Sequence, residues 1–158
     1  MAGTRPLPRT TRWTGWTSRP EVGHGVISFE PQTNLERLLV QAHTHPTSAK
    51  AYEAFVRELM GAVIGALGRR EPHGFQPLVL APAGMTGVCV FSHPLRYHRF
   101  SNEVMLPAPD WEVRPEQTRQ LCGWAVANEL SVLLNPGSEC GKDFPAFELE
   151  RMLRGQWV

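Results

Sequence analysis

The sequence predicts a single α+β domain: one mixed sheet of about four to five strands, packed with helices and preceded by a disordered N-terminal tail. Three observations predict this fold class. The length of 158 residues suits one compact domain. Apolar residues recur at helical spacing in some segments and form short runs bounded by Gly and Pro in others. The two kinds of segment mix without strict strand–helix alternation, which favours one sheet with helices against it.

The N-terminal segment differs from the rest of the chain in charge. Residues 1–26 carry four arginines against one glutamate, a net charge of +3, whereas residues 27–158 carry −2. This composition predicts a disordered tail, although an Arg-rich, acid-poor start is also typical of an organelle transit peptide. We also hypothesise that the tail is a non-native extension and that the natural chain starts at Val26, which the intact mass of the native protein tests. Residues 27–158 are expected to form the domain.

Two helices are predicted first. Thr33 and Glu36 have the spacing of a capping box, and the leucines that follow share one helical face as far as residue 42. Pro46 ends this helix, and Thr47 or Ser48 caps a second. At Gly61 two readings compete: the helix continues to residue 67, or it breaks and 62–67 forms a short strand. We favour the break.

The remaining elements are short. Residues 68–77 are predicted as a loop, 78–81 and 88–91 as a hairpin, 93–100 as a short helix or a turn, and 103–106 as a strand. Pro115 is predicted to open a helix of about 14 residues. Residues 131–134 then form a strand, 135–141 a loop, and 144–153 a last helix capped by Asp143.

The loop after the 131–134 strand is the first candidate binding surface. It lies between a strand and a helix, as phosphate-binding loops do, but it has three residues between its glycines where such a loop has four, and Asp143 replaces the metal-binding hydroxyl. A tight turn that uses glycine for unusual backbone angles is the stronger reading. The candidate residues are Asn135, Pro136, Gly137, Ser138, Gly141 and Lys142.

Cys140 is the one candidate nucleophile. Lys142 and a nearby helix N-terminus would lower the pKa of its thiol, and His93 or His98 would have to approach in space as the base. Cys89 and Cys122 are expected to be small core residues. We name no catalytic residue, and Cys140 is kept as the enzymatic alternative.

Histidine, arginine and tryptophan supply the other candidate contacts. His43 and His45 have no acidic or cysteine partner nearby, so no metal site is predicted. His93 and Arg96 belong to a basic, aromatic-containing segment, 93–100, which is either a patch that meets an acidic protein surface or, as the stronger reading, a solvated face of the molecule. Trp111 is expected either to pack at the sheet edge or to contact a partner, because tryptophan is enriched at interface hot spots.

Composition narrows the class of partner and compartment. The net charge of +1 does not favour nucleic-acid binding. The sequence has no apolar run long enough for a secretory signal or a membrane span. Three scattered cysteines fit a reducing compartment. We therefore expect a cytoplasmic protein with no membrane and no nucleic-acid partner.

Three segments together resemble the N-terminal domain of the SseB family of bacterial proteins. The segments are Phe29-Glu-Pro-Gln-Thr-Asn-Leu-Glu36 with Ala51-Tyr-Glu-Ala-Phe55, Val88-Cys-Val-Phe-Ser92 with Leu95-Arg96, and Leu134-Asn-Pro-Gly-Ser138 with Gly141 and Phe144. The resemblance covers about residues 27–154. This sequence departs from the family at His93-Pro94, where acidic residues are usual, and in lacking a second domain.

What this resemblance implies is a non-enzymatic protein without established catalytic residues or cofactors, and a strand after Gly61. Some members resemble accessory or immunity proteins. The expected function is therefore a protein-binding module of that kind. The alternatives are an enzyme that uses Cys140 and binding of a small anion at the 135–142 loop.

Overall fold

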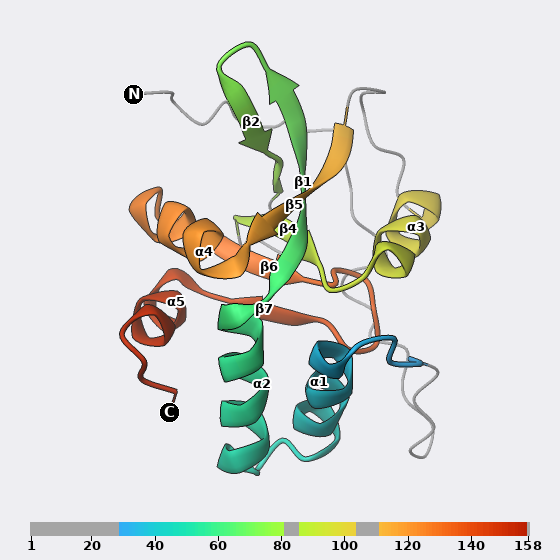
Figure 1. Ribbon diagram of the computed structural model, residues 1–158, viewed down its shortest axis with the longest axis vertical. Coiled ribbons are helices and arrows are strands. Elements are labelled where there is room, and N and C mark those ends of the chain that lie inside the picture. The colour runs from blue at the N-terminus through green and yellow to red at the C-terminus, as the bar shows by residue number, and fades with distance from the viewer. Residues whose placement is uncertain (1–28, 81–85, 104–110, 158) are drawn as a thin grey trace.

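A computed structural model describes residues 29–80, 86–103 and 111–157. The expectations for the tail and for initiation at Val26 lie outside these residues. Of the predicted 103–106 strand, residues 104–106 also lie outside them, and Glu103 is the last residue of helix α3 (Pro94–Glu103). Within the described residues the chain forms helices and a mixed seven-stranded sheet, which confirms the α+β class and exceeds the strand number expected (Figure 1).

The sheet has both antiparallel and parallel neighbours. Its main order is β2-β1-β4-β6-β7, with β3 paired to β4 and β5 paired to β1. β4 and β6 are parallel, and the other pairs are antiparallel. The strands are β1 (Val63–Glu71), β2 (Gly74–Pro77), β3 (Val79–Leu80), β4 (Gly87–Phe91), β5 (Trp111–Gln117), β6 (Ser131–Leu134) and β7 (Lys142–Phe144).

The two faces of the sheet bury different sets of residues. In β4, Val88 and Val90 belong to a large core with α1 (Asn34–Thr44), α2 (Ala49–Gly61), α4 (Thr118–Ala127) and α5 (Ala146–Leu153). The alternate residues Cys89 and Phe91 face a smaller cluster that contains Phe100 of α3. Strand alternation thus divides the molecule into a thickly covered face and a thinly covered one.

The predicted helix boundaries at the N-terminal side are confirmed. The Thr33 hydroxyl accepts a hydrogen bond from the backbone N–H of Glu36, and Ser48 does the same for Ala51. The break at Gly61 is also confirmed, because Ala62 has extended backbone angles and β1 begins at the next residue. The strand is longer than predicted, since it pairs with β5 as far as Arg69 and with β2 as far as Glu71.

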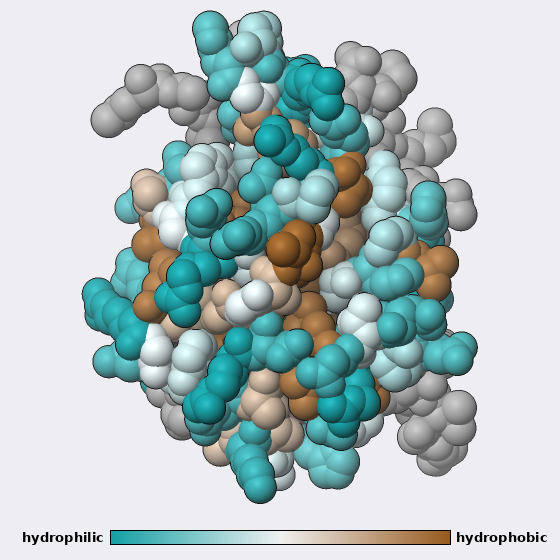
Figure 2. Space-filling view, viewed as in Figure 1, coloured by the Kyte–Doolittle hydropathy of each residue, from teal (hydrophilic) through white to brown (hydrophobic). Residues whose placement is uncertain are grey.

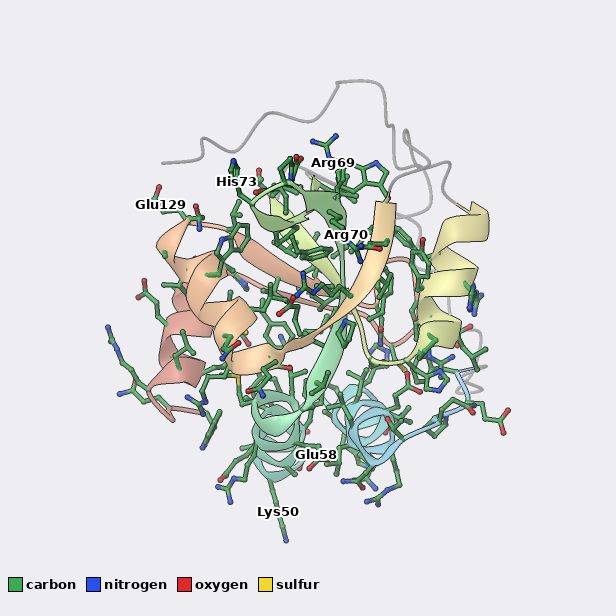
Figure 3. The ribbon with its side chains drawn as sticks, turned by 45° about the horizontal axis from the view of Figure 1, so that its top comes forward. Lys50, Glu58, Arg69, Arg70, His73 and Glu129 are labelled. Carbon is green, nitrogen blue, oxygen red and sulfur yellow. The ribbon has the colours of Figure 1, made fainter. Side chains whose placement is uncertain are left out.

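Three local predictions are wrong for reasons of sheet pairing. Residues 68–77 are not a loop, because β1 and β2 pair across them as a hairpin. Pro115 does not open a helix; it lies within β5, and α4 begins at Thr118. Asp143 is not a helix cap, because it pairs with Leu133 in β7, and α5 begins after Pro145. Figure 3 shows Arg69, Arg70 and His73 on the β1–β2 hairpin, away from Lys50 and Glu58 on α2.

Candidate functional site

The loop between β6 and β7 folds back on itself, as the sequence predicts. Asn135 adopts a left-handed backbone with φ of 48°, and Gly137 has φ of 76°. Gly141 lies so close to this turn that a Cβ on it would be 2.8 Å from the carbonyl oxygen of Asn135. The glycines are therefore required for the turn itself, one for its angle and one for its close approach.

Asn135 is completely buried and joins the loop to the start of α3. Its side-chain oxygen accepts a 2.9 Å hydrogen bond from the backbone N–H of Ser92, and its amide nitrogen donates to the Ser92 hydroxyl at 2.8 Å. The Ser92 hydroxyl in turn donates to the carboxylate of Glu36 at 2.6 Å. We call Glu36, Ser92, Arg96 and Asn135 the buried polar cluster.

An ion pair lies at the centre of the buried polar cluster. Arg96 reaches the Glu36 carboxylate through Nε at 2.7 Å, with side-chain exposures of 12% and 0%. The Arg96 guanidinium also stacks over the Phe29 ring at 3.6 Å and donates to the Glu30 carbonyl. Burial raises the pKa of Glu36, but hydrogen bonds from Arg96, Ser92 and Gln32 outweigh it, and the net pKa is lowered. The carboxylate is therefore ionised at neutral pH.

In the structure, the two candidate residues from segment 93–100, His93 and Arg96, do not form a solvated patch. Arg96 points inward to Glu36, so its charge is compensated within the chain. His93 lies at the start of α3, where its Nδ1 accepts a 3.1 Å hydrogen bond from the backbone N–H of Leu95. Among residues 94–100 of this helix, Pro94, Leu95, His98 and Arg99 are exposed. Arg96 therefore serves as an internal anchor rather than as a contact surface.

A groove of about 670 Å³ lies between the loop and the first two helices. Its apolar part comes from Leu39 and Ala42 of α1 and from Phe55 of α2. Around this part lie polar groups from His43 and Tyr52 and from the loop residues Asn135, Gly137, Ser138, Gly141, Lys142 and Asp143. Five of the six loop residues singled out from the sequence thus line one groove, and the sixth, Pro136, is buried beside it.

Three side chains form a second polar group at this groove. Lys142 Nζ lies 3.3 Å from a carboxylate oxygen of Glu148 and 5.3 Å from the centre of the Tyr52 ring. The Tyr52 hydroxyl donates to the same carboxylate, and burial together with this bond raises the pKa of Tyr52. We call Tyr52, Lys142 and Glu148 the groove cluster. About a third of the Lys142 side chain is exposed.

The cysteine chemistry considered from the sequence is not favoured. Cys140 is buried, and burial followed by the charge of Glu139 raises the pKa of its thiol to about 11. The thiol is therefore protonated at neutral pH, the opposite of an activated nucleophile. Cys89 and Cys122 are buried, as predicted.

The part of the chain that the structure describes has no candidate metal site, because no three His, Cys, Asp or Glu side chains there lie close enough together to hold an ion. His43 lines the groove, and the His45 ring contacts the Thr44 hydroxyl and the Gln41 carbonyl.

Trp111 lies on β5, far from the loop in sequence. Its ring packs against the smaller core cluster, and the Arg69 guanidinium lies 5.6 Å from the ring centre. Its Nε1 is buried without a hydrogen-bond partner. Trp111 therefore packs at the sheet edge, which is one of the two alternatives predicted for it.

Comparisons with protein-family models, curated proteins and solved structures find no match. Among the described residues, the helices lack the combination of length and apolar character that a bilayer span requires.

Sequence reasoning missed the central role of Glu36. A glutamate three residues after a threonine indicates a capping box, and half of that motif is present. The carboxylate, however, accepts from the Gln32 backbone, Ser92 and Arg96, the last two some sixty residues away. No local pattern signals such a partner, because the contact depends on how α1 packs beside α3.

Proposed function

We propose that this chain is a non-catalytic, SseB-like protein-binding module of the bacterial cytoplasm, acting as an accessory or immunity-type protein. Its contact surface is the groove between the β6–β7 loop and helices α1 and α2. The observation that carries the proposal is the composition of this groove, an apolar floor from Leu39, Ala42 and Phe55 inside a rim of polar groups. Protein interfaces have this anatomy, with an apolar centre and a polar rim.

The occupant that fits is a surface loop of another protein that inserts one apolar side chain. Lys142 and Asp143 both line the groove, and the Lys142 ammonium is already paired with Glu148, so the rim has no single sign of charge that would select a strongly charged ligand. The acidic groups also disfavour a small anion, and the raised pKa of Cys140 disfavours covalent chemistry. We therefore infer that the groove binds its partner through complementary shape and apolar contact.

The experiment places a photo-crosslinking amino acid at Ser138 in the groove and, as control, at Arg70 on the distant hairpin. We expect a protein crosslinked from the source cell at Ser138 and not at Arg70. The captured protein is then purified and its affinity measured for two variants. Ala42→Arg fills the groove, whereas Gln41→Arg places the same side chain on the exposed neighbouring position.

The expected result is a loss of about tenfold or more in affinity for Ala42→Arg and little change for Gln41→Arg. Equal affinity of the two variants would show that the groove is not the contact surface. A turnover activity abolished by Cys140→Ser, with no crosslinked protein, would replace the proposal with the enzymatic alternative.

A further inference from the structure

Strand β5 lies at an edge of the sheet. It pairs with β1 from Trp111 to Gln117, and no other strand of the described residues pairs with it. An edge strand presents backbone N–H and C=O groups that another strand can pair with. The geometry of the β1–β5 ladder shows which groups these are.

Two hydrogen bonds set the pattern of the ladder. The backbone N–H of Thr118 donates to the carbonyl of Ala62, so even-numbered residues of β1 and β5 face each other in hydrogen-bonded pairs. The carbonyl of Leu67 accepts instead from Leu78, on the far side of β1. Odd-numbered residues of β5 therefore direct their backbone groups outward, with Pro115 lacking the N–H.

An apolar groove of about 620 Å³ lies beside this edge on the thinly covered face. Val113 and Pro115 of β5 line one side, and Phe91 and Tyr97 line the other. Val63, directly beneath, is 60% exposed. Figure 2 shows hydrophobic surface near the middle of the view, over β1 and β5. A large exposed apolar side chain beside an unpaired edge is what an interface would cover.

We propose that two copies of the chain associate through their β5 edges, antiparallel and with the two-fold axis at Val113, so that the two sheets become one. In this register Val113 pairs with the partner's Val113 through two hydrogen bonds, and each Trp111 N–H reaches the partner's Pro115 carbonyl. The ladder therefore has four hydrogen bonds, none of which requires the missing proline N–H.

Charge complementarity selects this register. Glu112 lies opposite the partner's Arg114, and the pair occurs twice because of the symmetry. Both side chains are about half-exposed and lie on the same face of β5. Opposite charges directly across a strand pair stabilise it, and like charges destabilise it.

The neighbouring registers would give a less stable strand pair. An axis at Glu112 would put the two Glu112 carboxylates opposite each other, and an axis at Arg114 would do the same to two guanidinium groups. An axis at Pro115 would place two residues without N–H groups at the centre of the ladder. The Val113 register also brings the Trp111 ring beside the partner's Pro115, at the rim of the apolar groove.

The experiment measures mass by sedimentation velocity on the full chain and on charge-reversal variants. We expect the unaltered chain to be a concentration-dependent dimer. Arg114→Glu places a glutamate opposite the partner's Glu112 at both symmetric positions. Glu112→Arg places an arginine opposite the partner's Arg114 at both positions. Each variant should raise the dimer dissociation constant by about tenfold or more. The control Arg57→Glu reverses an exposed charge on α2 and should leave the dimer unchanged.

The decisive measurement mixes the two weakened variants. In the mixed dimer both charged cross-strand pairs are again Glu opposite Arg, so association should return only when both variants are present. This outcome also shows that each variant folds. A chain that remains monomeric up to about 0.5 mM, or a mixture that does not associate, would overturn the proposal. Binding of a partner in the α1–α2 groove is measured separately and does not depend on this result.

Discussion

Two clusters of similar chemistry, one buried and one partly exposed, hold the two ends of the β6–β7 loop. At its start, Glu36 takes hydrogen bonds from Ser92 and Arg96, and the Arg96 guanidinium lies over a Phe ring. At its end, Glu148 contacts Tyr52 and Lys142, with the Lys142 ammonium over aromatic rings. Each cluster has a carboxylate, a hydroxyl, a cation and an aromatic surface.

The difference between them is burial. The carboxylate of Glu36 is inaccessible, whereas a quarter of Glu148 and a third of Lys142 are exposed. A buried ion that loses its partner keeps the full desolvation penalty, but an exposed one is rehydrated. The buried polar cluster therefore fixes the loop, and the groove cluster leaves the loop's outer surface available for contact.

The largest effect is expected from Arg96→Met. This change keeps the length of the side chain but leaves the Glu36 carboxylate buried without its cation, so we expect the free energy of unfolding to fall by about 3–5 kcal/mol. Urea denaturation at neutral pH measures it. The matched change Arg57→Met, in an exposed pair on α2, should cost less than about 1 kcal/mol. Similar losses in both variants would contradict the assigned role of burial.

The next effect concerns Asn135, which carries the buried polar cluster into the loop. Asn135→Gly keeps the left-handed backbone and removes the hydrogen bonds to Ser92, for an expected loss of about 1–3 kcal/mol. Asn135→Ala adds strain of about 1 kcal/mol, because its Cβ disfavours positive φ. If alanine were tolerated as well as glycine, the turn would not depend on this angle.

The pH dependence of stability tests the buried polar cluster through Glu36. The pKa of Glu36 is lower in the folded chain than its ordinary value of 4.5, so folding favours the ionised form. Its contribution to stability is present above that ordinary value and is lost as the pH falls below it through the folded pKa. Glu36→Gln should therefore flatten the acid limb of the stability curve, measured by thermal unfolding from pH 6 down to about pH 3. An unchanged slope would exclude Glu36 as a source of the acid sensitivity.

The smallest effect is expected in the groove cluster. Lys142→Met should lower stability by less than about 1 kcal/mol, because the pair is partly exposed and Tyr52 still donates to Glu148. Thermal unfolding of this variant beside Arg96→Met gives the contrast directly. A loss as large as that of Arg96→Met would mean that both ends of the loop are structural.

Several elements were predictable because their causes are local. Thr33 and Ser48 cap the helices that follow them, and Gly61 ends α2 where the sequence suggested it. Residues 88–91 and 131–134 are short apolar runs and form buried strands. The turn at Asn135 and Gly137 was also readable, because asparagine and glycine tolerate left-handed angles.

Other elements depended on neighbours that are distant in sequence. Pro115 has the features of a helix start, yet β1 supplies a pairing partner along the whole of β5, and an edge position makes the missing N–H harmless. Residues 142–144 are too short to indicate a strand alone and form one only against β6.

The α+β class, the caps, the breaks and the candidate loop can be predicted from residue type and from spacing over a few positions. That Arg96 turns inward to Glu36 while Lys142 remains at the surface depends on the packing of the whole fold. Both cations stand in polar, aromatic-rich segments, so composition does not distinguish them. What distinguishes them is how far packing removes each carboxylate partner from water, and that depends on the arrangement of helices that are far apart in the chain.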